Sequence, residues 1–454
     1  MPMIDKLTKV IRNPASLGER ALNASLWNVA GLGMRYPIRL AGNLIMARLV
    51  APEAFGLMAT VTALHIGLSL ISEVGFTQSV MRSEKGEQPR FLRVVWTVQI
   101  MRGALLTLVM LLLALAVLFL GPVYAGADTV YADPRLPGLL CIAAIAILAR
   151  GFESTTVLLA RRRMRLARVK LSELISQAAG VSAMIAIGLI YPSVWALAAG
   201  LAVRAITRAI LSHNIFPGPR MALRWDPGEM RELWSFGKWM IIASIGGYFA
   251  AYSDRLIFGA LVDKELFGLY AIAMVWVELG VQILQMIGSS VFIPAFSAVM
   301  RENPGRIGPA FRKALWTFGC LTFAIFTALY FLGGWVIEQL YPAAYLDARL
   351  LLPFLAFRLI MLMFIPLREY IVSTGDSRYA AFAQTVAGLS AIASIYVAYH
   401  LFGFETAILA FALSAIPAVA LQMLYPPLRR LLPHMWVALA LCYPLTLGIW
   451  MMLG

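Results

Sequence analysis

Charged residues are scarce in this sequence. Asp, Glu, Lys and Arg together make up 13% of it, whereas hydrophobic residues make up 61% and the mean hydropathy is +0.80. Soluble domains are about 45–50% apolar and about 25% charged, so this composition excludes a water-soluble fold. Apolar runs of about 20 residues recur along the chain, and each is long enough to cross a bilayer core as a helix. We therefore predict an all-α, polytopic membrane protein without a separate soluble domain.

Cysteine and histidine are also scarce, with three and four residues. The cysteines lie inside apolar runs and none has the spacing of metal ligands, so we expect neither disulfides nor a metal site. No P-loop motif is present, which argues against ATP as the direct energy source, and no cofactor is expected. The N-terminal stretch lacks the apolar core of a cleavable signal peptide. We interpret residues 1–23 as a basic amphipathic segment on the cytoplasmic membrane surface.

The apolar runs predict thirteen membrane spans, and the charges between them predict the orientation. One set of alternate connections, the N-terminal segment included, holds 24 Lys and Arg residues, and the other set holds 4. Cytoplasmic connections are the ones enriched in these residues, so we expect a cytoplasmic N-terminus. The predicted spans are roughly 24–48, 53–80, 94–120, 137–160, 171–191, 194–215, 234–260, 267–298, 311–337, 350–373, 378–402, 405–427 and 434–453.

The chain contains an internal repeat. "LVAPEAFGLMA" (49–59) returns as "LVDKELFGLYA" (261–271), and two other short stretches recur in the same order at similar shifts. An even number of spans separates the two copies, so both halves enter the membrane from the same face, as in a parallel repeat with a pseudo-two-fold axis along the membrane normal. We expect two homologous six-helix lobes around a central cleft, and a Phe-Gly pair that packs the first hairpin of each lobe. The predicted units are the lobes 24–215 and 234–427, the cytoplasmic linker 216–233 and an extra C-terminal helix within 428–454.

Five stretches within about residues 24–300 carry a family resemblance: "LIMARLVAPEAFGLMA", "ISEVGFTQSVMRSEK", "VLLARRRMRLARV", "SDRLIFGALVDKELFGLYAIA" and "FIPAFSAVM". In this order they resemble the polysaccharide and oligosaccharide flippases of bacterial inner membranes, of the colanic-acid-exporter type. These belong to the multidrug/oligosaccharidyl-lipid/polysaccharide exporter superfamily, whose members usually have 12 to 14 spans.

The resemblance implies a non-enzymatic function. It implies that an undecaprenyl-diphosphate-linked oligosaccharide is moved from the cytoplasmic to the outer leaflet of the inner membrane, for exopolysaccharide, capsule or O-antigen synthesis. The expected partners are the lipid-linked substrate, the bilayer and a polysaccharide polymerase with its export machinery. No nucleic acid is expected, and we expect a monomer.

Charges inside the predicted spans are mostly cationic. A positive excess inside a membrane is costly and usually faces a wet cavity, and a diphosphate suits it because guanidinium groups bind phosphate oxygens through paired donors. The embedded acids are Glu73, Glu153, Asp254 and Glu278. The embedded arginines are Arg35, Arg39, Arg102, Arg150, Arg204, Arg208, Arg255 and Arg358.

The first span is the strongest candidate for the substrate site. Asn28, Arg35 and Arg39 share one helical stripe, and Pro37 between the arginines removes a backbone hydrogen bond. We interpret the stripe as part of a diphosphate site and Pro37 as a gating kink; the alternative is a kink that serves packing alone. Near mid-span, Arg204 and Arg358 are further candidates.

Two other groups allow more than one interpretation. In the eighth span Glu278, Gln282 and Gln285 share a stripe that would line the second lobe's side of the cleft, or form a hydrogen-bond seam between helices. Arg150 either joins the site or is neutralised by Glu153, three residues further on. We expect two other arginines to extend to a membrane surface: Arg208 to the cytoplasmic face and Arg255 to the outer end of the seventh span.

Two other functions compete with flipping of a lipid-linked sugar. A membrane glycosyltransferase, polymerase or ligase would need a sizeable outer loop with catalytic groups, and the longest outer connection is about 16 residues. A multidrug exporter of the same superfamily would favour an acidic cavity for cationic drugs, whereas the charges here are mostly arginines.

Overall fold

The structure is a computed structural model that describes residues 17–72, 80 and 83–431. Within these ranges, it leaves undescribed the side chains of residues 231–243 and of part of the first helix, Asn28 among them. The described chain consists mainly of helices joined by short connections, and its described residues form no strand, only one isolated β-bridge between Thr129 and Asp263. The all-α fold predicted from composition is confirmed.

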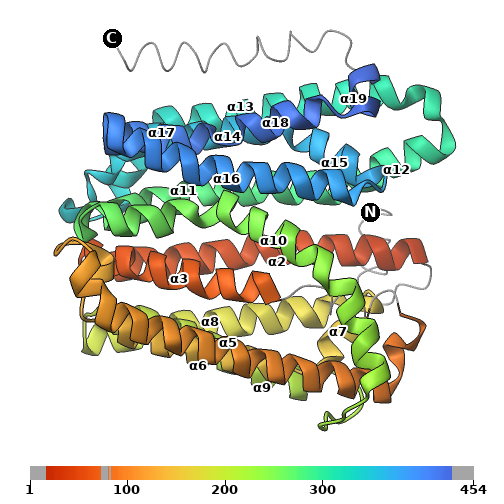
Figure 1. The fold of residues 1–454 in the computed structure, drawn as a ribbon, viewed down its shortest axis with the longest axis horizontal. Helices are drawn as coiled ribbons and strands as arrows, with labels where there is room; N and C mark the ends of the chain where they lie inside the picture. The colour runs from red at the N-terminus through yellow and green to blue at the C-terminus, as the bar shows by residue number, and fades with distance from the viewer. Residues whose placement is uncertain (1–16, 73–79, 81–82, 432–454) are drawn as a thin grey trace, which may run out of the picture.

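The helices of the first half run from red to yellow-green and those of the second half from green to blue (Figure 1). The first half holds α2 (Leu17–Ala47), α3 (Pro52–Ser72), α5 (Pro89–Tyr124), α6 (Leu136–Gly151), α7 (Thr156–Arg162), α8 (Leu166–Ile190) and α9 (Val194–Asn214). The second half holds α10 (Pro227–Leu261), α11 (Lys264–Ile287), α12 (Ile293–Glu302), α13 (Ile307–Leu340), α14 (Ala348–Met361), α15 (Ile365–Ser373), α16 (Ser377–Phe402), α17 (Phe404–Leu413), α18 (Ile416–Met423) and α19 (Pro426–Leu431).

Twelve of the predicted spans coincide with these helices; the thirteenth, 434–453, lies outside the described residues. Among the described residues, nine helices are long and apolar enough to cross a membrane, or ten if the bent pair α6–α7 counts as one span. The helices α2 and α10 are not among the nine, although they are 31 and 35 residues long. Both carry charged residues within their membrane-length stretch, including Arg35, Arg39, Asp254 and Arg255.

Several spans are interrupted, which the sequence did not predict. The span predicted at 137–160 bends by 63° between α6 and α7, and the eighth span passes through a π-helical turn at Gly288–Phe292. Proline stands in the first turn of each segment that resumes after an interruption in the second half, in α12, α15 and α18, where its missing N–H is not needed. Pro37, in contrast, lies inside α2, which continues on both sides of it.

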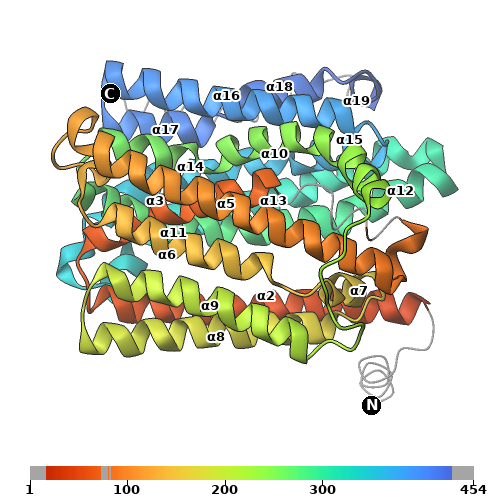
Figure 2. The ribbon, with the colours of Figure 1, turned by 60° about the horizontal axis from the view of Figure 1, so that its bottom comes forward.

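The connections alternate between two ends of the bundle. We call the basic end the one formed by connections 83–88, 163–165, 215–226, 303–306 and 374–376. We call the opposite end the one formed by 48–51, 125–135, 191–193, 262–263 and 341–347. Figures 1 and 2 both separate α8 and α9 from α16 and α17, so the two halves lie side by side. The helices α2 and α10 both finish at the opposite end, so they run in the same direction, as a parallel repeat requires.

The two copies of the duplicated turn contact each other across the interface between the halves. A Cβ added at Gly56 would lie 2.9 Å from the carbonyl oxygen of Lys264 and 3.0 Å from the amide nitrogen of Gly268, and a Cβ at Gly268 would lie 2.0 Å from the carbonyl oxygen of Pro52. Each copy of the Phe-Gly pair therefore contacts the other copy, as residues beside a two-fold axis do. The pair also packs its own hairpin in the second half, as we expected, because Phe267 stacks on Tyr270, which in turn packs against Phe258 of α10.

Aromatic side chains extend this contact. Phe55 packs edge-to-face against Tyr345 of the second half, with ring centroids 5.9 Å apart. The hydroxyl of Tyr345 donates a hydrogen bond to the carbonyl oxygen of Val50 at 2.6 Å. The opposite end of the interface between the halves is therefore closed by backbone, rings and hydrogen bonds together.

Replacing Gly268 by alanine should destabilise the protein. The new methyl group has no room against Pro52, so α3 and α11 must move apart at a cost of about 1–3 kcal/mol, as for other overpacked sites. The melting temperature of the purified protein should fall. Gly33→Ala is the matched control, because a Cβ at Gly33 meets nothing within 4 Å and alanine favours a helix. Equal melting temperatures for the two variants would contradict the close approach.

Candidate functional site

A small pocket lies between the halves, where α2 faces α11. It encloses about 240 Å³, open solvent included, and is lined by Tyr36, Arg39 and Leu40 of α2 and by Val275, Glu278, Leu279 and Gln282 of α11. The structure thus brings together three residues that the sequence singled out on two different helices: Arg39, Glu278 and Gln282. Gln285 lies one turn further along α11 and is exposed.

Glu278 is the common partner of arginines from both halves. Nη2 of Arg39 lies 3.8 Å from its carboxylate, across the interface, and Arg255 of α10 donates a hydrogen bond to the other oxygen. Arg255 is 7% exposed and also lies 3.8 Å from Asp254, whose carboxylate accepts a hydrogen bond from Tyr270 at 2.6 Å. Our expectation that Arg255 extends to the membrane surface was wrong, because two buried carboxylates hold it inside.

The two other candidates nearby have different surroundings. Nε of Arg35 is buried and has no hydrogen-bond partner among the described residues; its guanidinium lies 6.0 Å from the Tyr36 ring. The guanidinium of Arg358 lies 4.3 Å from the Phe411 ring and donates hydrogen bonds of 3.4 Å to two carbonyl oxygens of α10. Arg358 is thus held mainly by the Phe411 ring and by the backbone of α10, whereas Nε of Arg35 remains available as a hydrogen-bond donor.

Arg204 lies between this region and a second group of arginines. Its Nη1 donates a hydrogen bond of 3.2 Å to the side-chain oxygen of Gln177. It is also within electrostatic range of four other arginines: Arg35, Arg39, Arg150 and Arg208.

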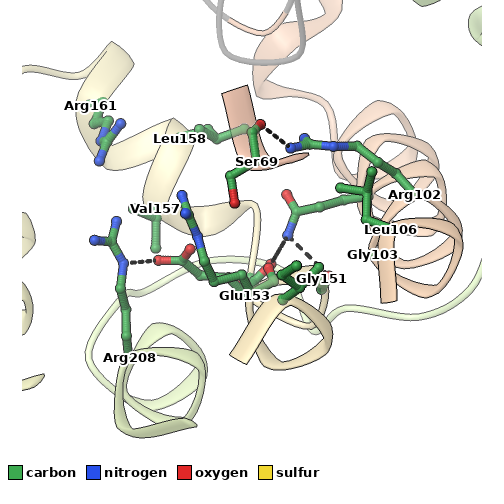
Figure 3. A pocket seen from close by; sticks show the side chains of 14 residues that line it. Ser69, Arg102, Gly103, Leu106, Gly151, Glu153, Val157, Leu158, Arg161 and Arg208 are labelled. Carbon is green, nitrogen blue, oxygen red and sulfur yellow. Dashed lines mark hydrogen bonds and ion pairs between the residues drawn. The ribbon is translucent and has the colours of Figure 1, made fainter. Parts of the chain in front are cut away.

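A larger pocket occurs at the α6–α7 bend (Figure 3). It encloses about 770 Å³, open solvent included, and α3, α5, α6, α7 and α9 contribute to its wall. Its charged lining residues are Arg102, Arg150, Glu153, Arg161 and Arg208. We call it the bend pocket.

The bend is possible because the backbone carbonyl groups that are freed where α6 ends have other hydrogen-bond partners. Gln99 of α5 donates hydrogen bonds to the carbonyl oxygens of Arg150, Gly151 and Glu153, at 3.3, 3.1 and 2.7 Å. Side chains that satisfy freed backbone groups are what a broken helix in a membrane requires. The run "GFESTT" after Arg150 rarely occurs inside a helix, and it is the signal by which sequence reasoning could have found this break.

The break places Glu153 outside a helix. Glu153 lies in the connection after α6 and forms an ion pair with Arg208 of α9. The sequence offered two interpretations of Arg150, as part of the site or as a partner of Glu153, and both stay predictions. Arg208, which we expected to extend to the cytoplasmic face, is instead bound to Glu153 and lies 3.8 Å from Glu173.

Four charged side chains at the opposite end form what we call the interlobe cluster: Glu53, Asp133, Arg135 and Lys264. Arg135 lies 2.7 Å from Asp133 and 3.0 Å from Glu53, all in the first half. Lys264 of the second half lies 3.4 Å from Asp133 and 3.6 Å from Glu53. Burial raises the pKa of Asp133, but the hydrogen bonds from Arg135 outweigh it, so the pKa lies below its ordinary value. The sequence gave no hint of this cluster because its members come from three distant segments.

Within the described residues, no three His, Cys, Asp or Glu side chains lie close enough together to hold a metal ion. The described charged groups of the region form arginine–carboxylate pairs, such as Arg255 with Glu278 and Arg208 with Glu153. Such an arrangement binds anions through charge-assisted hydrogen bonds.

Comparison with known proteins gives one family and several solved structures. A family model described as polysaccharide biosynthesis protein matches residues 45–350. An inward-facing multidrug resistance MATE family transporter of the MOP superfamily has 13% identity and a TM-score of 0.66, over 89% of this chain and 98% of its own. The lipid II flippase MurJ in an inward closed conformation has 12% identity and a TM-score of 0.67, over 88% and 86%.

A third similar structure is a MOP superfamily transporter from Pyrococcus furiosus, described as having a binding pocket of reversed polarity. It has 15% identity and a TM-score of 0.56, over 93% of this chain and 98% of its own. No curated protein matches the chain by sequence. At these identities the structural likeness establishes the fold.

Replacing Lys264 by methionine should loosen the opposite end. The substitution removes the two ion pairs of the interlobe cluster that cross between the halves. Each exposed pair stabilises by up to about 1 kcal/mol, or about fivefold in population. Spin labels at Tyr191 and Leu350, in a cysteine-free background, should report a larger fraction of long distances. In Arg349→Gln, which breaks an ion pair to Glu338 inside the second half, the distribution should not change.

Measuring the same spin-label distances at different pH values provides a control. A carboxylate with a lowered pKa contributes its interactions at every pH above its unfolded value, about 4, and loses them only below. The distances in the unmodified protein should therefore be constant between about pH 5 and 8, and Asp133→Asn should resemble Lys264→Met. Identical distributions in all variants would show that the cluster does not hold the halves together.

Proposed function

Because the chain belongs to the polysaccharide biosynthesis protein family and has the fold of MOP superfamily transporters, we propose that it is a flippase for a lipid-linked oligosaccharide. The substrate would be an undecaprenyl-diphosphate-linked glycan, moved from the cytoplasmic to the outer leaflet of the inner membrane for exopolysaccharide, capsule or O-antigen synthesis. The halves 24–215 and 234–427, joined by the linker 216–233, would provide alternating access by rocking against each other.

The observation that carries this proposal is the excess of arginines over carboxylates at the interface between the halves. Arg39 lines the α2–α11 pocket, with Arg35 one turn before it on α2, and Arg255 pairs with Glu278 of the pocket wall. The described carboxylates beside these arginines are Asp254 and Glu278. An arginine deep in a membrane costs about 2.5–3.5 kcal/mol or more unless a partner stabilises it. A diphosphate supplies that partner, and its apolar tail can remain in the lipid.

The geometry also suggests which arginines would bind. Arg255 is committed to two buried carboxylates, whereas Arg39 lies 3.8 Å from Glu278, beyond hydrogen-bond distance. A diphosphate could take Arg39 from Glu278 while Arg255 continues to neutralise that acid. Arg35 would supply a second donor. We keep Asn28, Gln282 and Gln285 as proposed contacts of the headgroup, and Pro37 as the proposed gate between the two arginines.

The competing enzymatic function has less support. A glycosyltransferase or polymerase needs a catalytic carboxylate near an open face, and the long connection at the opposite end contains Asp128 and Asp133. Asp133 is buried and occupied by Arg135 and Lys264. Asp128 is exposed, and its carbonyl oxygen accepts a hydrogen bond from the amide of Lys264.

Arg35→Ala should abolish transport without unfolding the protein. Arg35 lies 12 residues before the end of α2, about 18 Å at 1.5 Å per residue, which is too deep to reach a surface easily. Its removal deletes a phosphate donor and no described carboxylate loses a partner. In vesicles containing labelled undecaprenyl-diphosphate oligosaccharide, headgroup exposure in the opposite leaflet should fall to the protein-free level, and Arg35→Lys should recover it only in part.

Arg39 provides the contrasting variant. If Arg39 only braces Glu278, then Arg39→Ala should lower protein abundance and Arg39→Ala with Glu278→Gln should restore both abundance and transport. Under the proposal the double variant remains inactive, because the phosphate ligand is still missing. Normal transport by both Arg35→Ala and Arg39→Ala at normal abundance would rule out a diphosphate site on α2.

The proposed orientation has its own test. The positive-inside rule places the basic end in the cytoplasm. A cysteine at Tyr124, which is 83% exposed near the opposite end, should react with a membrane-impermeant thiol reagent added to intact cells. A cysteine at Glu302, exposed near the basic end, should react only after the membrane is permeabilised. The reverse pattern would invert the topology and the direction of transport.

A further inference from the structure

We propose that the bend pocket binds the phosphate of a lipid headgroup at the basic end of the first half. The site itself does not depend on the proposed function. Only the identification of the headgroup with the substrate's diphosphate rests on that function. The alternative source of the same chemistry is an anionic phospholipid.

The first argument is the origin of its charges. The bend pocket receives one arginine from each of four helices: Arg102 from α5, Arg150 from α6, Arg161 from α7 and Arg208 from α9. The described acid in its wall is Glu153, which Arg208 binds. Figure 3 shows Arg161 and Arg208 on the opposite side of the hollow from Arg102. Several guanidinium groups converging on one cavity can surround a phosphate, because each presents several donors.

The second argument is that the cavity is built into the fold. A Cβ at Gly103 would lie 2.8 Å from Cα of Gly151, so α5 and α6 cross in backbone contact just before the bend. Beyond this crossing, α7 departs by 63° and leaves the volume of about 770 Å³ open. The backbone at the bend is already satisfied by Gln99.

The third argument is the depth of the bend pocket in the membrane. Arg208 lies six residues before the end of α9 at Asn214, which is about 9 Å along the helix axis. Arg161 lies in the last turn of α7, beside the connection 163–165. The pocket is thus near the level of the headgroups at the basic end, where basic pockets between helices bind lipid headgroups. A free anion in bulk solution would not need a site at this depth.

The fourth argument is the connection to the central pocket. Arg204 is within electrostatic range of Arg150 and Arg208 on one side and of Arg35 and Arg39 on the other. Arg204 therefore interacts electrostatically with arginines that line both pockets. If the headgroup belongs to the substrate, the bend pocket is where it is held before it moves between the halves.

Site-specific photolabelling tests the proposal on the full-length protein in detergent. One probe is a benzophenone-tagged prenyl diphosphate, another is a photoactivatable phosphatidylglycerol, and a photoactivatable phosphatidylcholine is the zwitterionic control. Mass spectrometry of the peptides should locate the label of at least one anionic probe within residues 99–106 and 150–161. Arg102→Gln with Arg150→Gln should lower this labelling at least tenfold.

The matched control for charge is Arg168→Gln, because Arg168 is exposed at the basic end and outside the pocket; its labelling should equal that of the unmodified protein. Since the double variant changes two inward-facing charges, Leu106→Trp is a second test that fills the pocket and keeps every arginine. It should lower labelling by a similar factor. Labelling of these peptides that is absent, or unaffected by both the double variant and Leu106→Trp, would overturn the proposal.

The probes separate the two sources and the two proposals. Stronger labelling by the prenyl diphosphate assigns the pocket to the substrate, and stronger labelling by phosphatidylglycerol assigns it to a membrane lipid; either result supports a headgroup site. Arg35→Ala should leave labelling of the bend pocket unchanged. Failure of the unmodified protein to move the lipid-linked glycan in vesicles would remove the proposed function while leaving the labelled site in place.

Discussion

The backbone contact between the two copies of the duplicated turn fixes the rest of the arrangement. Gly56 and Gly268 let α3 and α11 approach so closely that neither position has room for a side chain. This approach sets the distance between the halves at the opposite end. Lys264 can then reach Glu53 and Asp133, and α11 is aligned beside α2. The duplicated turn therefore positions the two halves against each other.

Sequence patterns predicted the periodic features well and the interrupted ones poorly. Composition and apolar runs gave the all-α fold and twelve helical spans, because the cost of exposing backbone to lipid leaves few alternatives. The same reasoning missed the α6–α7 bend, since its partner Gln99 lies about 50 residues earlier in the chain. It placed Arg39 and Glu278 on separate stripes, and their proximity depended on how two helices pack. Arg255 was misjudged because its buried partners Asp254 and Glu278 were counted only as scattered acids.

Glu278 shows why single charges in a membrane are hard to interpret from sequence alone. A carboxylate beside Arg39 and Arg255 lowers the cost of both arginines, and so lets the protein keep them inside the membrane before any substrate arrives. Its two partners are not equivalent: Arg255 is buried and hydrogen-bonded, whereas Arg39 is more exposed and further away. The acid therefore stabilises one arginine firmly and restrains the other weakly. That inequality is what an anion site needs, because a ligand can displace only the weaker contact at small cost.

The two arginine groups have different consequences for movement. The bend pocket lies wholly within the first half, on α3, α5, α6, α7 and α9, so rocking of one half against the other leaves its geometry intact. The α2–α11 pocket is divided between the halves, so any rocking changes the distance from Arg39 to Glu278. An anion in the first pocket would experience a constant field, and an anion in the second would experience one that depends on the conformation. A carrier that must release its ligand on the far side requires the second property, and only a site shared by both halves can supply it.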